Sequence, residues 1–363
     1  MSYPIVTGTV LVEANGAALN NGGQEPGARV DNAIVVKQIR VGRLRYPYVS
    51  GQAWRRWWRE VLYEDFGWQR SPITTIKKPQ QAFTAGDPIT FEEDDIFGYM
   101  VARKRAQKGK KGTEPEENGE AASQAGTYRR ISPLKNSLLV SVLANVIDRD
   151  FGHFTRNLPV DADPLLFEAE HYTTYLNGVF TVSLSDVGRF EVGEMRDLPE
   201  EAVKNKQDLT NEGERGYVLS QEKRIKRVKD VIDALSRLRG GARLARNLSD
   251  VTPVAVLIGF LDGGNAPFQR LFEADANNER VVLNLSRLRS VLSDYRERLL
   301  KPEEGKAVYL GYYPSVLANE AEVAQALETD EVLKATVALV KTPKDALDKA
   351  AAAVNQVFTK HSL

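Results

Sequence analysis

The sequence contains no cysteine, and this absence removes several classes of chemistry at once. Disulfide bridges, thiolate nucleophiles, iron–sulfur clusters and cysteine-ligated zinc are all excluded. Only three histidines occur in 363 residues, so few imidazoles remain for acid–base or metal chemistry. No apolar run approaches the roughly 20 residues of a membrane span, and the start, MSYPIVTGTVLVEANG, lacks a signal-peptide pattern. We expect a cytoplasmic protein with no membrane partner, no metal and no cofactor.

A net charge is also absent, because 49 basic residues balance 49 acidic ones. This balance does not exclude a nucleic-acid partner, since binding depends on where the basic groups lie. Hydrophobic residues make up 42% of the chain, which is enough for a sizeable core. The length suits one large domain or two ordinary ones.

The order of the expected elements indicates an α+β fold. Periodicity and composition predict strands at 4–14, 33–42, 178–190 and 251–261, and helices at 52–66, 220–239, 280–300 and from 330 onwards. Long polar excursions separate several of these elements, and a compact domain seldom carries them without a function. The pattern favours a modified ferredoxin-like βαββαβ unit with insertions.

The stretch YPYVSGQAWRRWWRE, residues 46–60, concentrates tryptophan and arginine in a few positions. Trp54, Trp57 and Trp58 recur at helical spacing, and Ser50 is a good N-cap for that helix. The arginines on its flanks and opposite side are Arg55, Arg56 and Arg59. In one interpretation these arginines form an ordinary solvated face of the helix. The other holds their planar guanidinium groups on a rigid helix as phosphate contacts, which makes RNA binding plausible.

Other candidates carry less specific chemistry. His153 and His171 lie in one excursion, yet no carboxylate at a diagnostic spacing supports a metal or acid–base role. Asp31, in a glycine-rich loop, is either a turn residue or an acid worth testing. The basic stretch EKRIKRVK, residues 222–229, is typical of the solvated face of a helix.

The glycine-rich stretch GGARLAR contains Gly240, Gly241 and Arg243. It either stops one helix and starts another, or lets the backbone approach a phosphate. It is not a Walker loop, because the G-K-[ST] ending is missing.

Five blocks in order resemble a known family. They are DNAIVVKQIRVGRLRYPYVSGQAWRRWWRE, DIFGYM, SPLKNSLLVSVLANV, FEAEHYTTYLNGVFTVSL and RGGARLARNLSDVTP. Together they resemble the Cas-seven backbone subunit of CRISPR Cascade complexes, in its DevR-type, type I-B form, within the RAMP superfamily. The resemblance implies a single RNA-recognition-motif palm over 1–363, a finger excursion at 70–95, a mobile finger loop at 103–130 and a thumb at 148–177.

The resemblance also implies a noncatalytic role. Copies of the chain would stack helically along one CRISPR RNA and kink it at intervals, so that a target DNA strand pairs between the kinks. Leu166 or Phe167 would be the thumb wedge. Carried over to this sequence, the guide backbone would be held by Lys37, Ser50, Gln52, Arg55, Arg56, Arg59, Gly240, Gly241 and Arg243.

Further partners follow from the same resemblance. They would be the other Cascade subunits: the guide 5′-end cap, the guide-processing subunit and the large subunit. A rival hypothesis is an endoribonuclease of the same superfamily that uses His153 or His171, or the loop acid Asp31. A third is a monomeric RNA-binding domain, against which the many protruding segments argue.

Overall fold

A large mixed sheet forms the body of the molecule. The computed structural model describes residues 2–24, 33–77, 80–103, 126–155, 158–159, 163–204, 206–302 and 305–363. The central strand β1 (Pro4–Ala17) pairs antiparallel with β13 (Leu165–Ser183) and with β17 (Pro253–Asp262). Beyond β17 lie β20 (Val308–Tyr312) and β21 (Val337–Val340), and beyond β13 lie β10 (Leu134–Asn136), β11 (Leu139–Ser141), β5 (Leu44–Val49) and β4 (Gln38–Val41).

Apolar residues on both faces of β1 explain its central place. Val6 and Val10 join one hydrophobic cluster, and Leu11 joins a second cluster on the other face. A strand that is buried on both faces reads as a nearly continuous apolar run, as this one does. The sheet therefore needs a helical layer on each side.

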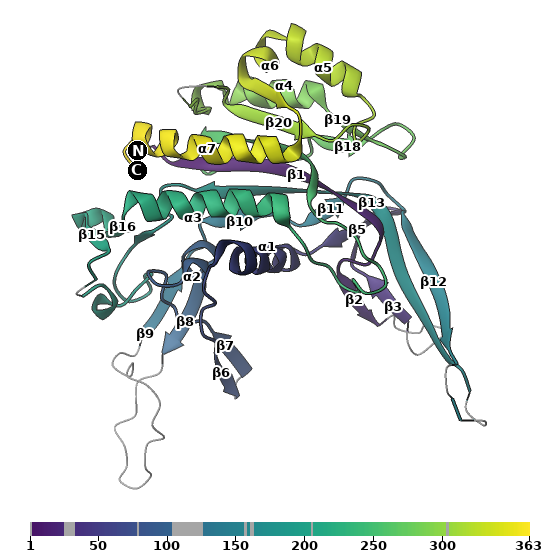
Figure 1. The fold of residues 1–363 in the computed structure, drawn as a ribbon, viewed down its shortest axis with the longest axis horizontal. Helices are drawn as coiled ribbons and strands as arrows, with labels where there is room; N and C mark the ends of the chain where they lie inside the picture. The colour runs from purple at the N-terminus through teal and green to yellow at the C-terminus, as the bar shows by residue number, and fades with distance from the viewer. Residues whose placement is uncertain are drawn as a thin grey trace.

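Three helices cover the first face: α1 (Gly51–Phe66), α3 (Gln221–Ala234) and α7 (Pro343–His361). They lie side by side in Figure 1, and α3 contacts both of the others. Trp58 meets Phe180 of β13 edge to face, with ring centroids 5.7 Å apart. Aromatic pairs in this geometry add stability beyond the area they bury.

The C-terminal part of the chain covers the second face. Its elements are β18 (Phe272–Ala274), β19 (Val281–Leu283), α4 (Leu285–Asp294), α5 (Glu320–Thr329) and α6 (Glu331–Thr336). Leu288 and Leu292 of α4 are buried against this face of the sheet. None of the described helices has the length and apolarity to cross a bilayer.

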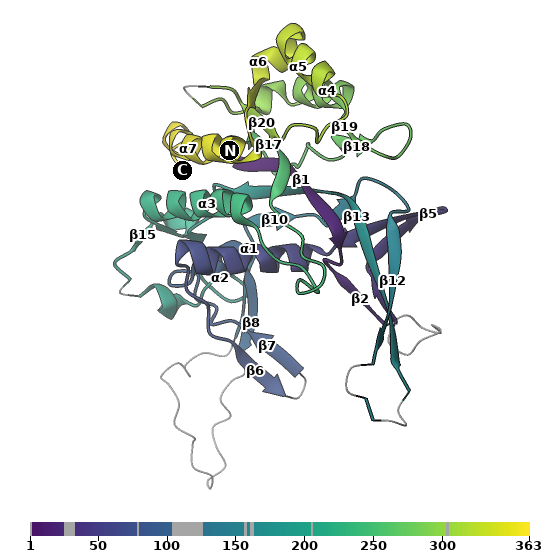
Figure 2. The same ribbon diagram turned by 45° about the vertical axis from the view of Figure 1, so that its right-hand side comes forward.

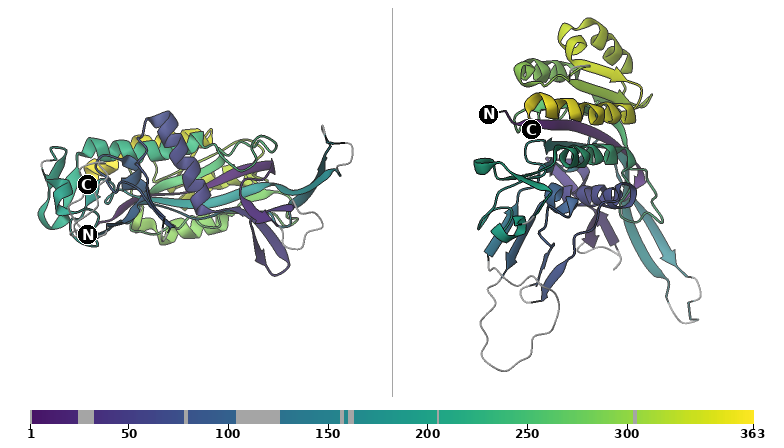
Figure 3. Two further views of the ribbon diagram at one scale, coloured as in Figure 1. Left: turned by 90° about the horizontal axis from the view of Figure 1, so that it is seen from below. Right: turned by 60° about the vertical axis from the view of Figure 1, so that its left-hand side comes forward.

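Two groups of strands project from the body in the same direction (Figures 1 and 3). One is a long hairpin of β12 (Ile147–Phe154) and the first half of β13, flanked by β2 (Asn21–Gln24) and β3 (Ala33–Val36). The other contains the hairpins β6–β7 (Thr74–Lys77, Gln80–Phe83) and β8–β9 (Tyr99–Arg103, Gly126–Arg130).

The α+β class predicted from the sequence is confirmed, with differences at particular elements. The strand expected at 33–42 is two strands, because the chain leaves the ladder at Lys37 between β3 and β4. The short strand β21 lies within the C-terminal segment that was predicted to be helical. The short helix α2 (Glu92–Phe97) was not predicted, and three of its acids, Glu93, Asp94 and Asp95, are buried.

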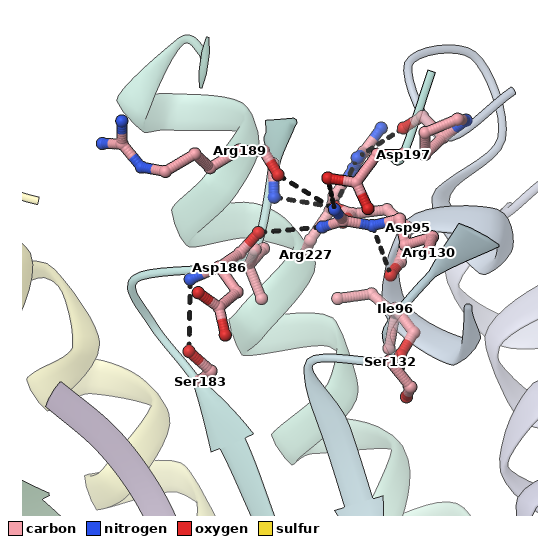
Figure 4. Close-up of polar contacts among 12 residues, drawn as sticks. Asp95, Ile96, Arg130, Ser132, Ser183, Asp186, Arg189, Asp197 and Arg227 are labelled. Carbon is pink, nitrogen blue, oxygen red and sulfur yellow. Dashed lines mark hydrogen bonds and ion pairs between the residues drawn. The ribbon is translucent and has the colours of Figure 1, made fainter. Parts of the chain in front are cut away.

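Asp95 of α2 lies at the centre of a buried ionic cluster at the base of the β8–β9 hairpin (Figure 4). One of its carboxylate oxygens accepts a hydrogen bond from Arg130 of β9, and the other pairs with Arg227 of α3 at 2.6 Å. The backbone amide of Gly188 also donates to it, at 2.9 Å. Burial acts to lower the pKa of Arg130, but Asp95 and Asp197 raise this pKa above its ordinary value. The cluster therefore joins three elements through one carboxylate.

This cluster corrects the interpretation of EKRIKRVK as a solvated helix face. Arg224 is 1% exposed and Arg227 is 4% exposed. Arg224 donates hydrogen bonds to the carbonyls of Val187 and Leu184, at 2.7 and 2.8 Å. The small sheet of β14 (Arg189–Phe190), β15 (Leu209–Asn211) and β16 (Tyr217–Leu219) also lies in this region. Two of the five cations of the basic stretch therefore serve the interior.

Replacing Asp95 tests the cluster. We expect Asp95→Ala to lower the free energy of unfolding by about 3 to 5 kcal/mol, because it leaves the buried Arg227 without its counter-ion and Arg130 with Asp197 alone. Urea titration followed by circular dichroism measures the change. Asp348→Ala, which removes an exposed pair with Lys344, is the control and should leave stability unchanged. Equal, small losses in both variants would contradict the assignment.

Candidate nucleic-acid interface

Helix α1 forms as its sequence predicts. The Ser50 side chain accepts a hydrogen bond from the Ala53 amide, and Gly67 ends the helix in a left-handed conformation with φ 72°. The three tryptophans are buried, and the Trp58 indole donates to the carbonyl of Val231 in α3 at 2.9 Å. The indoles thus fix the helix against the sheet and α3, as predicted.

Arg55 is committed to the protein interior rather than to an outside ligand. Its guanidinium donates to the carbonyls of Leu134 and Phe97, at 2.8 and 2.9 Å, and to the side chains of Asn136 and Ser132, at 3.1 and 2.9 Å. Four of the five guanidinium N–H groups are therefore in use. Burial, with the charge of Arg59 next, lowers the pKa of Arg55 to about 10, so the group stays charged at neutral pH.

The other predicted RNA-binding side chains of α1 differ in how available they are to an outside ligand. Arg59 stacks on Phe97, 4.4 Å from the ring centroid, and lies 3.9 Å from Glu93. Gln52 and Arg56 are exposed. Within the part of the chain that the structure describes, no residue accepts a hydrogen bond from Arg56. Of the three arginines of α1, it is the one available to a ligand.

Asn20, in the turn between β1 and β2, connects two predicted site residues. Its side-chain oxygen accepts a hydrogen bond from the Ser50 amide at 2.8 Å. Its backbone carbonyl accepts one from the Lys37 amide at 3.2 Å. The preceding residue, Leu19, accepts a hydrogen bond from Ala242 at 3.1 Å. Lys37, the start of α1 and the glycine-rich loop therefore meet at one turn.

The glycines of this loop are required by their neighbours. Gly240 adopts φ 154°, and a Cβ there would lie 2.2 Å from the Trp57 ring. Gly241 adopts φ 134° against Leu19. Arg243 adopts φ 58°, and its carbonyl accepts hydrogen bonds from the amides of residues 246 and 247. Glycine lets the loop pass close over α1, so a side chain on either one would displace it.

The electrostatics at the start of α1 favour an anion. The first amides of a helix have no partner within it, and the aligned peptide dipoles add partial positive charge. The first turn of α1 contains no acidic residue. The Ser50 side chain already caps the Ala53 amide, so a phosphate would find the earlier amides of Gly51 and Gln52, with Arg56 one turn further along the helix.

The end of the β12–β13 hairpin carries apolar side chains on both faces. Residues directly opposite in an antiparallel pair share a face, and successive residues alternate. Phe154 pairs with Leu165 on one face, and Leu166 pairs with His153 on the other. Phe154, Leu165 and Leu166 are exposed. A two-faced apolar end suits insertion between two surfaces.

The two candidate wedge residues are in different environments. The Phe167 ring lies over Gly152, where a Cβ would be only 2.2 Å from it. Arg246 of the glycine-rich loop lies over the same ring, 5.4 Å from its centroid. Leu166, in contrast, is 43% exposed. Phe167 thus connects the hairpin to the loop, and Leu166 is free to contact something else.

The structure also locates the other candidates. His153 pairs with Leu166 across the two strands, and His171 pairs with Asp148. The two histidines therefore lie on different faces of the hairpin. They are five positions apart along the ladder, or about 17 Å at about 3.3 Å per residue, so they cannot share a metal or substrate. Among the described residues there is no group of three or more metal-ligating side chains. Asp31 and most of the 103–130 loop fall outside the described residues.

Comparisons with known proteins agree with the resemblance drawn from the sequence. Residues 6–272 match the family described as "CRISPR-associated negative auto-regulator DevR/Csa2". The chain belongs to this DevR/Csa2 family. The resemblance to a DevR-type CRISPR protein is thereby confirmed. No curated protein is detectably similar to this member.

A solved structure shares the fold of this DevR/Csa2 member, and a second aligns less closely. A chain of a "CRISPR RNA-guided surveillance complex, pre-nicking" aligns with a TM-score of 0.50 at 11% identity, covering 96% of this chain and 100% of that one. A chain of a "CRISPR RNA-guided surveillance complex" aligns with a TM-score of 0.48 at 13% identity, covering 96% and 99%.

Sequence reasoning missed two residues that organise the interface. Arg246 lies within the GGARLAR stretch, so its basic character was visible although its contact with Phe167 was not. Asn20 lies in a run of asparagine and glycine residues whose composition indicates only a loop. Both act through contacts with residues far away in the sequence.

Arg55 and Arg56 give a matched pair of variants. We expect Arg55→Ala to lower the free energy of unfolding by about 2 to 4 kcal/mol, because it strips donors from four acceptors. Arg56→Ala should change it by no more than about 0.5 kcal/mol, since its side chain is exposed. Chemical denaturation of both variants measures the difference. Similar stability in the two would show that the Arg55 hydrogen bonds contribute little.

Proposed function

We propose that this protein is a noncatalytic, guide-RNA-binding backbone subunit of a CRISPR surveillance complex. The observation that carries the proposal is the meeting of Lys37, the start of α1 and the glycine-rich loop at the Leu19–Asn20 turn. Free helix amides, two cationic side chains and a close-approaching backbone are what a phosphate chain requires. Membership of a CRISPR-associated family supports guide RNA as the strand that carries these phosphates.

The palm of such a subunit corresponds to the centre of the sheet. In spatial order β17, β1, β13 and then β10 or β11 are all antiparallel to their neighbours. Along the chain the order is different. Helix α1 follows β1 and precedes β10 and β11, and helix α3 follows β13 and precedes β17. This is the βαββαβ order of a ferredoxin-like or RNA-recognition-motif unit, with the hairpins as insertions.

Roles within the interface follow from the freedom of each side chain. Lys37, Gln52, Arg56 and Arg243 contact the guide backbone through their side chains. Ser50, Gly240 and Gly241 shape the backbone that approaches it. Arg55 and Arg59 support the guide site from beneath, because their partners are Leu134, Phe97 and Glu93.

The β12–β13 hairpin is the thumb of this subunit. Its apolar end is exposed in the isolated chain and becomes buried when a neighbouring copy and the guide surround it. Leu166 is the wedge that separates stacked bases, and Phe167 fixes the wedge relative to the palm. Displacing a base costs a few kcal/mol, which contacts to phosphates and to the next copy offset.

Assembly follows from this geometry. Copies join head to tail into a helical homo-oligomer along the guide, since the same hairpin and palm meet at every step. A target DNA strand pairs with the guide between the displaced bases. Other subunits of the complex close the two ends of the filament.

Charge reversal at the free cations tests guide binding. We expect Lys37→Glu with Arg56→Glu to weaken binding of guide-length RNA about 10-fold or more, because repulsion replaces two phosphate contacts. Arg287→Glu with Lys349→Glu carries the same charge change at two exposed positions elsewhere and should bind normally. Filter binding at several salt concentrations measures both. Normal binding by the first pair would refute the site.

The wedge is tested separately from affinity. We expect Leu166→Ser to form filaments in which the periodic high reactivity of guide nucleotides to 2′-hydroxyl probing is lost, since nothing then holds the bases apart. Leu339→Ser, at a similarly exposed leucine on β21, serves as the control. A periodic pattern that survives in the Leu166 variant would assign the wedge to another side chain.

A further inference from the structure

The hairpin of β4 and β5 carries a concentration of positive charge of which the guide site uses only Lys37. The ten residues from Lys37 to Tyr46, KQIRVGRLRY, contain Lys37, Arg40, Arg43 and Arg45 and no acid. The chain as a whole is electrically neutral. The charge of this hairpin is therefore balanced elsewhere in the chain and not within the hairpin.

The register places the arginines together on the hairpin. Arg40 is directly opposite Arg45 across the two strands, so both share one face. Arg43 occupies the second position of the two-residue turn that Gly42 opens with φ 61°. All three arginines are exposed. Val41 and Leu44 face the other side, which leaves the arginine face polar.

This arrangement costs stability in the free protein. Like charges directly opposite each other in a sheet are destabilising. Among the residues that the structure describes, no carboxylate pairs with any of the three arginines. Protecting an edge strand from aggregation would need a charge on β4, but not a second one facing it and a third at the turn. An external anion would remove the repulsion.

The backbone of Arg45 itself, next to the turn of the hairpin, is held by Asn145. The Asn145 side chain accepts a hydrogen bond from the Arg45 amide at 3.0 Å, and the Asn145 amide donates to the Arg45 carbonyl at 2.7 Å. Asn145 lies two residues before β12, so this contact holds the backbone of the β4–β5 hairpin beside the start of β12 (Figure 2). A fixed backbone limits the space that the guanidinium groups can explore, which reduces the entropy lost when they bind a phosphate.

We propose that Arg40, Arg43 and Arg45 form a second binding site for a nucleic-acid phosphodiester backbone. Strand β5 runs from this site directly to Ser50, the N-cap of α1. Its six residues span about 20 Å at about 3.3 Å each. The hairpin therefore contacts a stretch of backbone separate from the phosphate at α1, either further along the guide or on the strand paired with it. The inference rests on the proposed function and extends it.

The test compares the triple variant Arg40→Ala, Arg43→Ala, Arg45→Ala with wild type. Binding is measured against salt concentration, once with single-stranded guide RNA and once with the same RNA paired to complementary DNA. Each phosphate contact contributes about 0.7 to the slope of log affinity against log salt on a single strand, so three contacts change the slope by about 2. A smaller slope with both the single-stranded RNA and the duplex indicates that the arginines contact the guide backbone. A smaller slope with the duplex alone indicates that they contact the paired strand.

The control is Arg270→Ala, Arg287→Ala, Arg296→Ala, which removes the same charge from three exposed positions in the C-terminal part. It should bind like wild type in both arms. An unchanged slope for the hairpin variant in both arms overturns the inference, as does an equal loss in the control. If the wild-type protein does not bind RNA at all, the proposed function is overturned instead.

Discussion

The burial of three tryptophans on one face of α1 is the constraint on which the rest of the interface depends. Because the indoles are packed on the sheet and α3, the helix cannot rotate, and its N-terminus keeps one position. The Trp57 ring in turn leaves room only for glycine at position 240. One packing choice therefore places the helix amides, the glycine-rich loop and the Asn20 turn together. A site built on rigid elements is more precise than one on loops alone.

Arginine has two separate uses in this protein. Arg55, Arg130, Arg224 and Arg227 are tied to carbonyls and carboxylates of the interior, where they hold neighbouring elements together. Arg40, Arg43, Arg45 and Arg56 are exposed and without a carboxylate in the part of the chain that the structure describes. Guanidinium suits both uses, because its fixed fork can satisfy several acceptors inside the protein or grip a phosphate outside it.

Local periodicity predicted α1 well, with residues 52–66 expected and 51–66 observed. The same reasoning could not divide the arginines, because what decides their role is far away in the sequence. Arg55 donates to a carbonyl 79 positions on, and Arg227 pairs with an acid 132 positions back. EKRIKRVK therefore has the pattern of a solvated face although two of its five cations are buried. The proposed function rests on the family resemblance, and the structure separates the buried arginines from the exposed ones.

The central claim is that identical copies share one RNA strand through a repeated phosphate contact. Mass photometry of the pure protein with guide RNAs of increasing length tests this most directly. The account predicts complexes whose mass rises in steps of one protomer as the RNA lengthens, and which dissociate at high salt. A protein that stays monomeric with every RNA at low salt, or binds one copy whatever the length, would contradict it.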